Sequence, residues 1–121
     1  MSVTLFGLSN CDTVRKARKA LEAADIPFTF HDFRKDGLSR SDVEAMIAAI
    51  GSEVLVNRRG TTWRALPDAD KALADGDGLA DILIAHPAII KRPVWKRDEE
   101  FLVGFAPKDA EARLTWAGGS T

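Results

Sequence analysis

Cysteine is the scarcest reactive residue in this sequence, and its scarcity excludes several kinds of site. Cys11 is the single cysteine in 121 residues. One thiol cannot form an intramolecular disulfide, so a disulfide-stabilised fold and a multi-cysteine zinc site are both excluded. The two histidines, His31 and His86, add too few ligands for a structural metal site. We therefore expect no metal, no bound cofactor, and a reducing compartment, the cytoplasm.

Long apolar runs and an excess of one charge are also missing. The longest apolar stretches are too short to cross a membrane, and residues 1–8 lack the pattern of an export signal. With 17 basic and 18 acidic residues the net charge is −1, which favours neither nucleic acid nor a membrane as partner. A chain of this length with 45% hydrophobic residues can bury one core. We expect a single domain over residues 1–121 and a monomer.

The first third of the chain reads as strand, helix, strand. Residues 3–6 form a short apolar run typical of a buried strand, and residues 28–33 alternate as a second strand. Between them the apolar period becomes helical. The predicted buried side of this helix is formed by Val14, Ala17, Leu21 and Ala24. A helix that connects two strands predicts that the strands pair in parallel.

The middle of the chain is predicted to be helical. A helix begins near Ser39 and ends at Gly51, and a polar loop follows at 57–62. Two shorter helices are expected at 68–74 and 79–85. These elements form a helical insert over about residues 38–86.

The end of the chain is predicted to return to the sheet. Residues 91–95 and 100–103 form a hairpin, Pro107 begins a last helix over 108–116, and the tail from Gly118 is frayed. The complete order is β-α-β, a helical insert, then β-β-α. This order predicts an α/β protein with a thioredoxin-like fold.

Cys11 lies between the first predicted strand and the helix that follows. Unpaired backbone N–H groups and the helix dipole favour an anion there, and the thiolate is the reactive form of cysteine. The amides of Thr13 and Val14 and the Thr13 hydroxyl are candidate donors to the sulfur, and Arg15 adds positive potential. Asp12 opposes it. The alternative is a small buried hydrophobic side chain, and the strand–helix junction favours the reactive interpretation.

Val14 stands where a dithiol enzyme would carry its second cysteine. A disulfide formed at Cys11 must then be resolved by a thiol from another molecule. The sequence therefore predicts a monothiol site.

Four segments, in order along the chain, carry a family resemblance. They are NCDTVRKA at 10–17, NRRGTTWR at 57–64, HPAIIKRPV at 86–94 and, more weakly, VGF at 103–105. On these segments the chain resembles the ArsC/Spx family, and most closely its YffB-like branch of arsenate-reductase-like proteins. The resemblance implies a thioredoxin-like fold with a helical insertion and a cis Arg92–Pro93 bond beside the reactive cysteine.

The resemblance also implies a set of site residues. Arg92 corresponds to an arginine that holds an oxyanion or carboxylate. An alignment without gaps from Trp63 places Asn57 at the family's substrate arginine, with Arg58 and Arg59 directly after it. Cys11 is then the expected catalytic residue. The expected substrate-binding residues are Thr13, Arg15, Asn57, Arg59, Arg92 and Pro93.

Three departures from the family pattern bear on the substrate. Gly7 replaces a histidine expected four residues before the cysteine, Asn57 replaces an arginine, and no arginine lies between Glu99 and Lys108. The oxyanion pocket is therefore predicted to be incomplete. Glutathione needs cationic anchors for its carboxylates, and Arg59, Arg92 and Lys91 are candidates.

Structural or surface roles are alternatives to these binding assignments. The arginines of the polar loop are equally explained as a solvated surface, and both histidines as structural residues. The tryptophans, Trp63, Trp95 and Trp116, are expected to pack rather than to stack on bases.

Three functions remain as hypotheses. The leading one is a glutathione-dependent thiol/disulfide oxidoreductase, with glutathione as co-substrate and glutaredoxin as a candidate partner. The alternative is an arsenate reductase in which Cys11 forms an arsenate adduct. The third is an RNA-polymerase-binding regulator like Spx, which Val14 disfavours because those proteins usually carry a dithiol.

Overall fold

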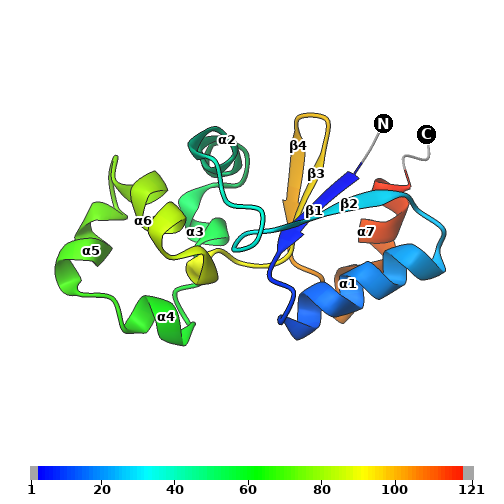
Figure 1. Ribbon diagram of the computed structural model, residues 1–121, viewed down its shortest axis with the longest axis horizontal. Coiled ribbons are helices and arrows are strands. Elements are labelled where there is room, and N and C mark those ends of the chain that lie inside the picture. Colours follow the sequence, from blue (N-terminus) through cyan, green and yellow to red (C-terminus); the bar gives the residue numbers. More distant parts are fainter. Residues whose placement is uncertain (1–2, 119–121) are drawn as a thin grey trace. The chain divides into compact units, whose positions relative to one another are not determined.

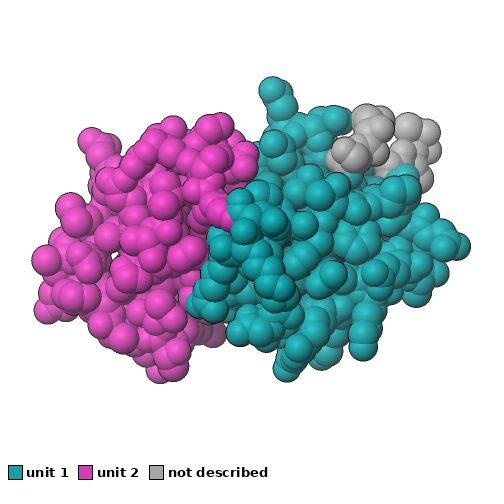
Figure 2. All heavy atoms as spheres, in the orientation of Figure 1, with its two compact units in different colours: residues 1–36, 92–121 teal, residues 37–91 magenta. Residues whose placement is uncertain are grey.

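The computed structural model describes residues 3–118, and the chain divides into two compact units (Figure 2). Unit 1 combines the two ends of the chain, Met1–Asp36 and Arg92–Thr121, and unit 2 is Gly37–Lys91. Most of the tail that we predicted to be frayed lies outside the described residues. No helix within residues 3–118 is both long and apolar enough to span a membrane.

Unit 1 is a four-stranded sheet with helices (Figure 1). Strand order is β2-β1-β3-β4, in which β1 and β2 are parallel and the other neighbours antiparallel. The predicted parallel pairing is confirmed. The elements are β1 (Val3–Gly7), α1 (Asp12–Ala23), β2 (Phe28–Asp32), β3 (Val94–Arg97), β4 (Glu100–Val103), a 3-10 turn (Pro107–Asp109) and α7 (Ala110–Ala117).

The core of unit 1 follows from the apolar periods. Val14, Ala17 and Leu21 are fully buried on one side of α1, as predicted, because residues three and four apart share a helix face. Ala24 is exposed, and its prediction as a core residue is wrong because the helix already ends there. Trp95 of β3 lies in the same buried cluster as Ala17 and Leu21.

Two boundaries in unit 1 differ from the sequence prediction. The hairpin strand begins at Val94 rather than at Lys91, because the Lys91 amide donates to the Leu55 carbonyl (2.7 Å) inside unit 2. The last helix begins as the 3-10 turn at Pro107, and the α-helical hydrogen bonds start at Ala110.

Unit 2 is built from helices. Ser39 caps the first of them, since its Oγ accepts the Asp42 amide (3.1 Å), and Gly51 ends it with a φ of 89°. Part of the predicted polar loop is helical, because α4 begins directly after Gly60. The elements are α2 (Arg40–Ile50), α3 (Ser52–Leu55), α4 (Thr61–Arg64), α5 (Asp68–Leu73), α6 (Leu79–Ala85) and a 3-10 turn (Pro87–Ile89).

Candidate functional site

Cys11 is the N-cap residue of α1. Its backbone is extended (φ −93°, ψ 125°), and its carbonyl accepts the first helical bond from the Arg15 amide at 3.0 Å. Its own amide donates to the Leu8 carbonyl at 3.1 Å, which closes a four-residue turn between β1 and α1. The side chain is half-buried rather than sealed in the core. The thiol therefore stands at the strand–helix junction with access to solvent.

The surroundings of the thiol differ from the sequence prediction. No backbone amide of α1 caps the Cys11 side chain in the described structure, so the proposed donation from Thr13 and Val14 is absent. Arg15 forms an ion pair with Asp12, and both side chains are largely exposed. The positive potential expected from Arg15 is thus offset by its partner's charge.

Gly7 and Val14 are in close contact. Val14 is fully buried, and a Cβ placed on Gly7 would lie 2.6 Å from Val14 Cγ2. Such a distance requires a shift of the neighbour, so a side chain at position 7 has no room while Val14 keeps its place. A histidine at position 7 therefore does not fit beside Val14 in this packing.

Asp32 is a residue that sequence reasoning missed. At 4% exposure it is the buried charged residue of the described chain, at the end of β2 beside Gly7 of β1. Its Oδ1 accepts the amides of Arg34 (2.8 Å) and Lys35 (3.0 Å), and its Oδ2 accepts the amide of Ser9 (3.0 Å). The local sequence, in which the apolar Phe33 directly follows Asp32, does not mark this residue as a buried turn residue.

The environment holds the Asp32 carboxyl in its ionised form. Burial alone would raise its pKa, but the amides of Lys35, Arg34 and Ser9 and the Ser9 hydroxyl together hold the pKa below its ordinary 3.8. A depressed folded pKa means that the native state binds fewer protons than the unfolded state near pH 3–4. The stability that Asp32 contributes is complete above about pH 4 and is lost as the pH falls through the folded value.

The substitution Asp32→Asn should therefore reduce the free energy of unfolding most at neutral pH. We expect a loss of about 1–3 kcal/mol in the free energy of unfolding at pH 7, because an amide cannot accept all three N–H groups. The difference in the free energy of unfolding between wild type and variant should become smaller as the pH falls from 4 to 2. Urea unfolding at several pH values measures this difference. A difference that stays constant with pH would contradict the role of the ionised Asp32 carboxylate.

Arg92 and Pro93 also belong to unit 1. The bond between them is cis, which confirms the prediction from the family resemblance. Pro93 is buried, and its carbonyl accepts the Gly104 amide at 2.8 Å. Arg92 is half-buried. Its side chain is therefore partly available to a ligand.

The remaining expected site residues, Asn57 and Arg59, lie in unit 2. With Arg58, Lys91 and Glu53 they line a cavity of about 440 Å³, in which three cations face one carboxylate and suit an anionic group. Arg58 stacks on Trp63 (5.3 Å from guanidinium carbon to ring centroid) and lies 4.0 Å from the Asp75 carboxylate. Arg58 thus has a packing role.

The Asn57 backbone is fixed within unit 2, since its amide donates to the Ile89 carbonyl at 2.7 Å. Arg59 is exposed and forms no ion pair within the described residues. Its guanidinium is the loop's candidate for binding an anion.

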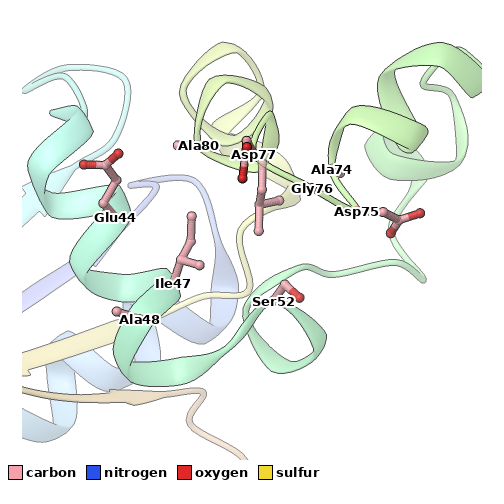
Figure 3. A pocket seen from close by; sticks show the side chains of 10 residues that line it. Glu44, Ile47, Ala48, Ser52, Ala74, Asp75, Gly76, Asp77 and Ala80 are labelled. Atoms are coloured by element: carbon pink, nitrogen blue, oxygen red, sulfur yellow. The ribbon is translucent and has the colours of Figure 1, made fainter.

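A second cavity of unit 2, of about 420 Å³, has the opposite charge (Figure 3). Its acidic lining residues are Glu44, Asp75 and Asp77, and its apolar ones include Ile47. Figure 3 places Glu44 and Asp75 at opposite edges of the view with Ile47 between them. Like charges repel a carboxylate or an oxyanion, so this cavity is not a candidate for either ligand.

An arginine does follow the hairpin, on α7, beyond the segment where the sequence lacks one. Arg113 donates to the carbonyls of Val103 (3.0 Å) and Gly104 (3.3 Å). Its guanidinium holds the helix to the end of β4. Trp95 is fully buried, which confirms its packing role, and His86 ends α6 as its C-cap residue.

Comparison with known proteins shows the family of this chain. Residues 6–113 match the ArsC family. The chain belongs to the ArsC family. An uncharacterized protein of Haemophilus influenzae is 39% identical over 110 residues, which cover 91% of this chain and 96% of the relative.

Two further relatives of this ArsC family member carry functional names. An arsenate reductase of Rhizobium meliloti is 34% identical over 95 residues, covering 77% of this chain and 67% of the relative. A global transcriptional regulator Spx of Streptococcus pyogenes is 27% identical, covering 93% and 85%. The relatives therefore include both a reductase and a regulator.

Solved structures confirm the fold. A protein named YFFB has a TM-score of 0.80 and 38% identity, covering 93% of this chain and 98% of its own. An arsenate reductase related protein from Brucella melitensis has a TM-score of 0.76 and 42% identity, covering 93% of each chain. The chain is thus an ArsC family member with a thioredoxin-like α/β fold.

Proposed function

We propose that this protein is a glutathione-dependent thiol/disulfide oxidoreductase with Cys11 as its nucleophile. The observation that carries the proposal is a half-buried single thiol at the N-terminus of α1, with Val14 where a second thiol would stand. The nucleophile in disulfide exchange is a cysteine thiolate, and Cys11 stands at the start of α1 as the N-cap residue. The missing second thiol requires an outside partner to complete each cycle.

The chemistry balances with glutathione as the outside thiol. The Cys11 thiolate attacks the glutathionyl sulfur of a glutathione mixed disulfide. The S–S bond to the substrate breaks as a new one forms at Cys11, and the substrate leaves as a thiolate that takes up a proton. A second glutathione thiolate then attacks the glutathionyl sulfur. This step releases Cys11 as thiolate and yields oxidised glutathione. In the net reaction the mixed disulfide is reduced to the substrate thiol, and one glutathione thiol is oxidised.

The carboxylates of glutathione need cationic partners. Arg92 is half-buried in the same unit as Cys11, and we propose that it binds one carboxylate. A guanidinium presents paired N–H donors that match a carboxylate. Within unit 2, the cavity of about 440 Å³ whose cations include Arg59 and Lys91 is proposed, by itself, as a site for an anionic group. Asn57 would add an amide donor.

Arg92→Ala is expected to slow mixed-disulfide formation with oxidised glutathione by about tenfold to hundredfold. The reason is the loss of a charge-assisted hydrogen bond, worth about 1.5–3 kcal/mol. The exposed Arg64→Ala on α4 is the matched control, since it removes the same charge at the surface of unit 2. Stopped-flow kinetics with a thermal melt of each variant measures the effect, and equal rates for both variants would exclude Arg92 as an anchor.

Arsenate reduction is the second candidate, because a relative with that name is 34% identical. In that reaction the Cys11 thiolate displaces an oxygen of arsenate, glutathione attacks the adduct, and arsenite leaves. The remaining mixed disulfide is resolved by glutaredoxin. Gly7 and Asn57 stand where the family resemblance implies oxyanion contacts, so we expect this activity to be weak.

One experiment separates the two reactions. The protein is incubated with oxidised glutathione and its mass is followed, while arsenate turnover is assayed in parallel with glutathione and glutaredoxin. We expect the mass of one glutathione at Cys11 and slow arsenate turnover. No mass gain together with rapid arsenate turnover would replace the proposed function by the arsenate reductase. Binding of RNA polymerase with neither activity would favour the regulator.

A further inference from the structure

The turn that carries Cys11 is attached to a buried carboxylate. Ser9 is the second residue of the turn Leu8–Cys11, and its amide donates to Asp32 Oδ2 at 3.0 Å. Ser9 and Asp32 are separated by 23 positions in the sequence, and all of α1 lies between them. This hydrogen bond therefore joins the approach to the thiol with the end of the neighbouring parallel strand.

The rest of the Asp32 environment is rigid. The Phe33 amide donates to the Gly7 carbonyl (2.9 Å), which continues the pairing of β1 and β2 to the point where the turn begins. On the other side the Asp32 amide donates to Asp36 Oδ2, and the Asp36 amide donates to the Asp32 carbonyl, both at 2.9 Å. Asp32 is thus fixed at both backbone groups as well as at its carboxylate.

The turn has little other side-chain support. In the described structure Cys11 makes no capping hydrogen bond of its own, and Asn10 is exposed. A turn of this kind is held by its one backbone bond, by the buried Leu8 and by the Ser9–Asp32 contact. Removing that contact would release the residue two positions before the nucleophile.

We propose that Asp32 is a positioning residue for Cys11: through the Ser9 amide it fixes the turn that presents the thiol at the start of α1. The proposal rests on the proposed function only in taking Cys11 as the reacting group. Asp32 itself contacts no substrate. Its effect is on the orientation of the thiol relative to a bound disulfide, and such orientation contributes strongly to reaction rates.

The substitution Asp32→Asn tests this with little change of shape. Three amide donors converge on two carboxylate oxygens, whereas asparagine offers one acceptor oxygen. We expect the asparagine oxygen to accept the two amides of Arg34 and Lys35. The Ser9 amide then faces the asparagine NH₂ group, which cannot accept its hydrogen bond, and the turn is released. Asp36→Asn is the matched control, because it removes one carboxylate charge from the same loop and leaves the Ser9 contact intact.

Two rates measured on each folded protein separate positioning from other roles. The rate of mixed-disulfide formation with oxidised glutathione should fall about tenfold in Asp32→Asn, whereas alkylation by iodoacetamide, which needs no bound partner, should change less than twofold. Asp36→Asn should leave both rates within twofold. An equal fall in both rates would assign Asp32 to the ionisation of the thiol. A rise in the glutathione rate would assign it to simple charge repulsion, and either result overturns the proposal.

Amide hydrogen exchange tests the same contact without any chemistry at Cys11. The Ser9 amide should be protected in the wild type, and Asp32→Asn should lose that protection at Ser9 and Cys11 while the middle of α1 keeps it. If the wild type fails to react with oxidised glutathione but shows this local change, the proposed function fails and the positioning role stands. A Ser9 amide that exchanges freely in the wild type overturns the positioning role, even if Asp32→Asn does not fold.

Discussion

Cys11→Ser is expected to lose all detectable mixed-disulfide formation with oxidised glutathione. A serine hydroxyl is almost entirely protonated at neutral pH and does not attack a disulfide. The variant should remain folded, and it should be equally stable or more stable by about 0.5–1 kcal/mol, because Cys11 is an N-cap and serine is a favoured N-cap residue. Intact-mass measurement reports the first effect and urea unfolding the second.

The matched control for that variant is Cys11→Ala. It removes the thiol as completely and supplies no capping oxygen, so it should be inactive and less stable than the serine variant. A glutathione adduct on either variant would show that the reaction does not occur at Cys11. A large loss of stability in Cys11→Ser would show instead that the sulfur is needed for packing.

Trp95→Ala is expected to cost about 3–5 kcal/mol in the free energy of unfolding, a large share of the stability of a small protein. Trp95 is fully buried on β3, paired in register with Leu5 of β1 and Leu102 of β4. Its ring lies 5.7 Å from that of Phe105, and its Nε1 donates to the Gly104 carbonyl at 2.9 Å. The variant loses both the packing and the hydrogen bond.

Two further variants separate these contributions. Trp95→Phe keeps a ring and removes the donor, so we expect an intermediate loss. Leu73→Ala, at a leucine that is 53% exposed on α5, should change stability by less than about 0.5 kcal/mol. Urea unfolding followed by circular dichroism measures all three. Equal losses for Trp95→Ala and Leu73→Ala would contradict the position of Trp95 in the core.

The contact between Gly7 and Val14 changes how the departures from the family pattern are interpreted. The absent histidine and the absent second cysteine look in the sequence like two independent losses of function. In the structure the Val14 side chain occupies the space next to the Gly7 Cα, so these two residues pack directly against each other. A side chain at position 7 would therefore require Val14 to move.

Local patterns in the sequence determined most of the fold and the place of the nucleophile. Apolar periods predicted α1 and its neighbouring strands, and a break in period placed Cys11 at the strand–helix junction. The cis Arg92–Pro93 bond followed from the family resemblance alone. These features depend on residues close together in the chain, or on a motif, and a sequence displays both directly.

Only the tertiary structure decided the contacts around the nucleophile. The Ser9–Asp32 hydrogen bond spans 23 positions, and no local pattern distinguishes Asp32 from an exposed aspartate. The sequence predicts Arg15 as a source of positive potential at the sulfur, but the Arg15 guanidinium forms an ion pair with the Asp12 carboxylate. Arg113 was missed because its partners are the backbone carbonyls of another element. Backbone groups carry no sequence signal, so only the folded chain shows which side chains they hold.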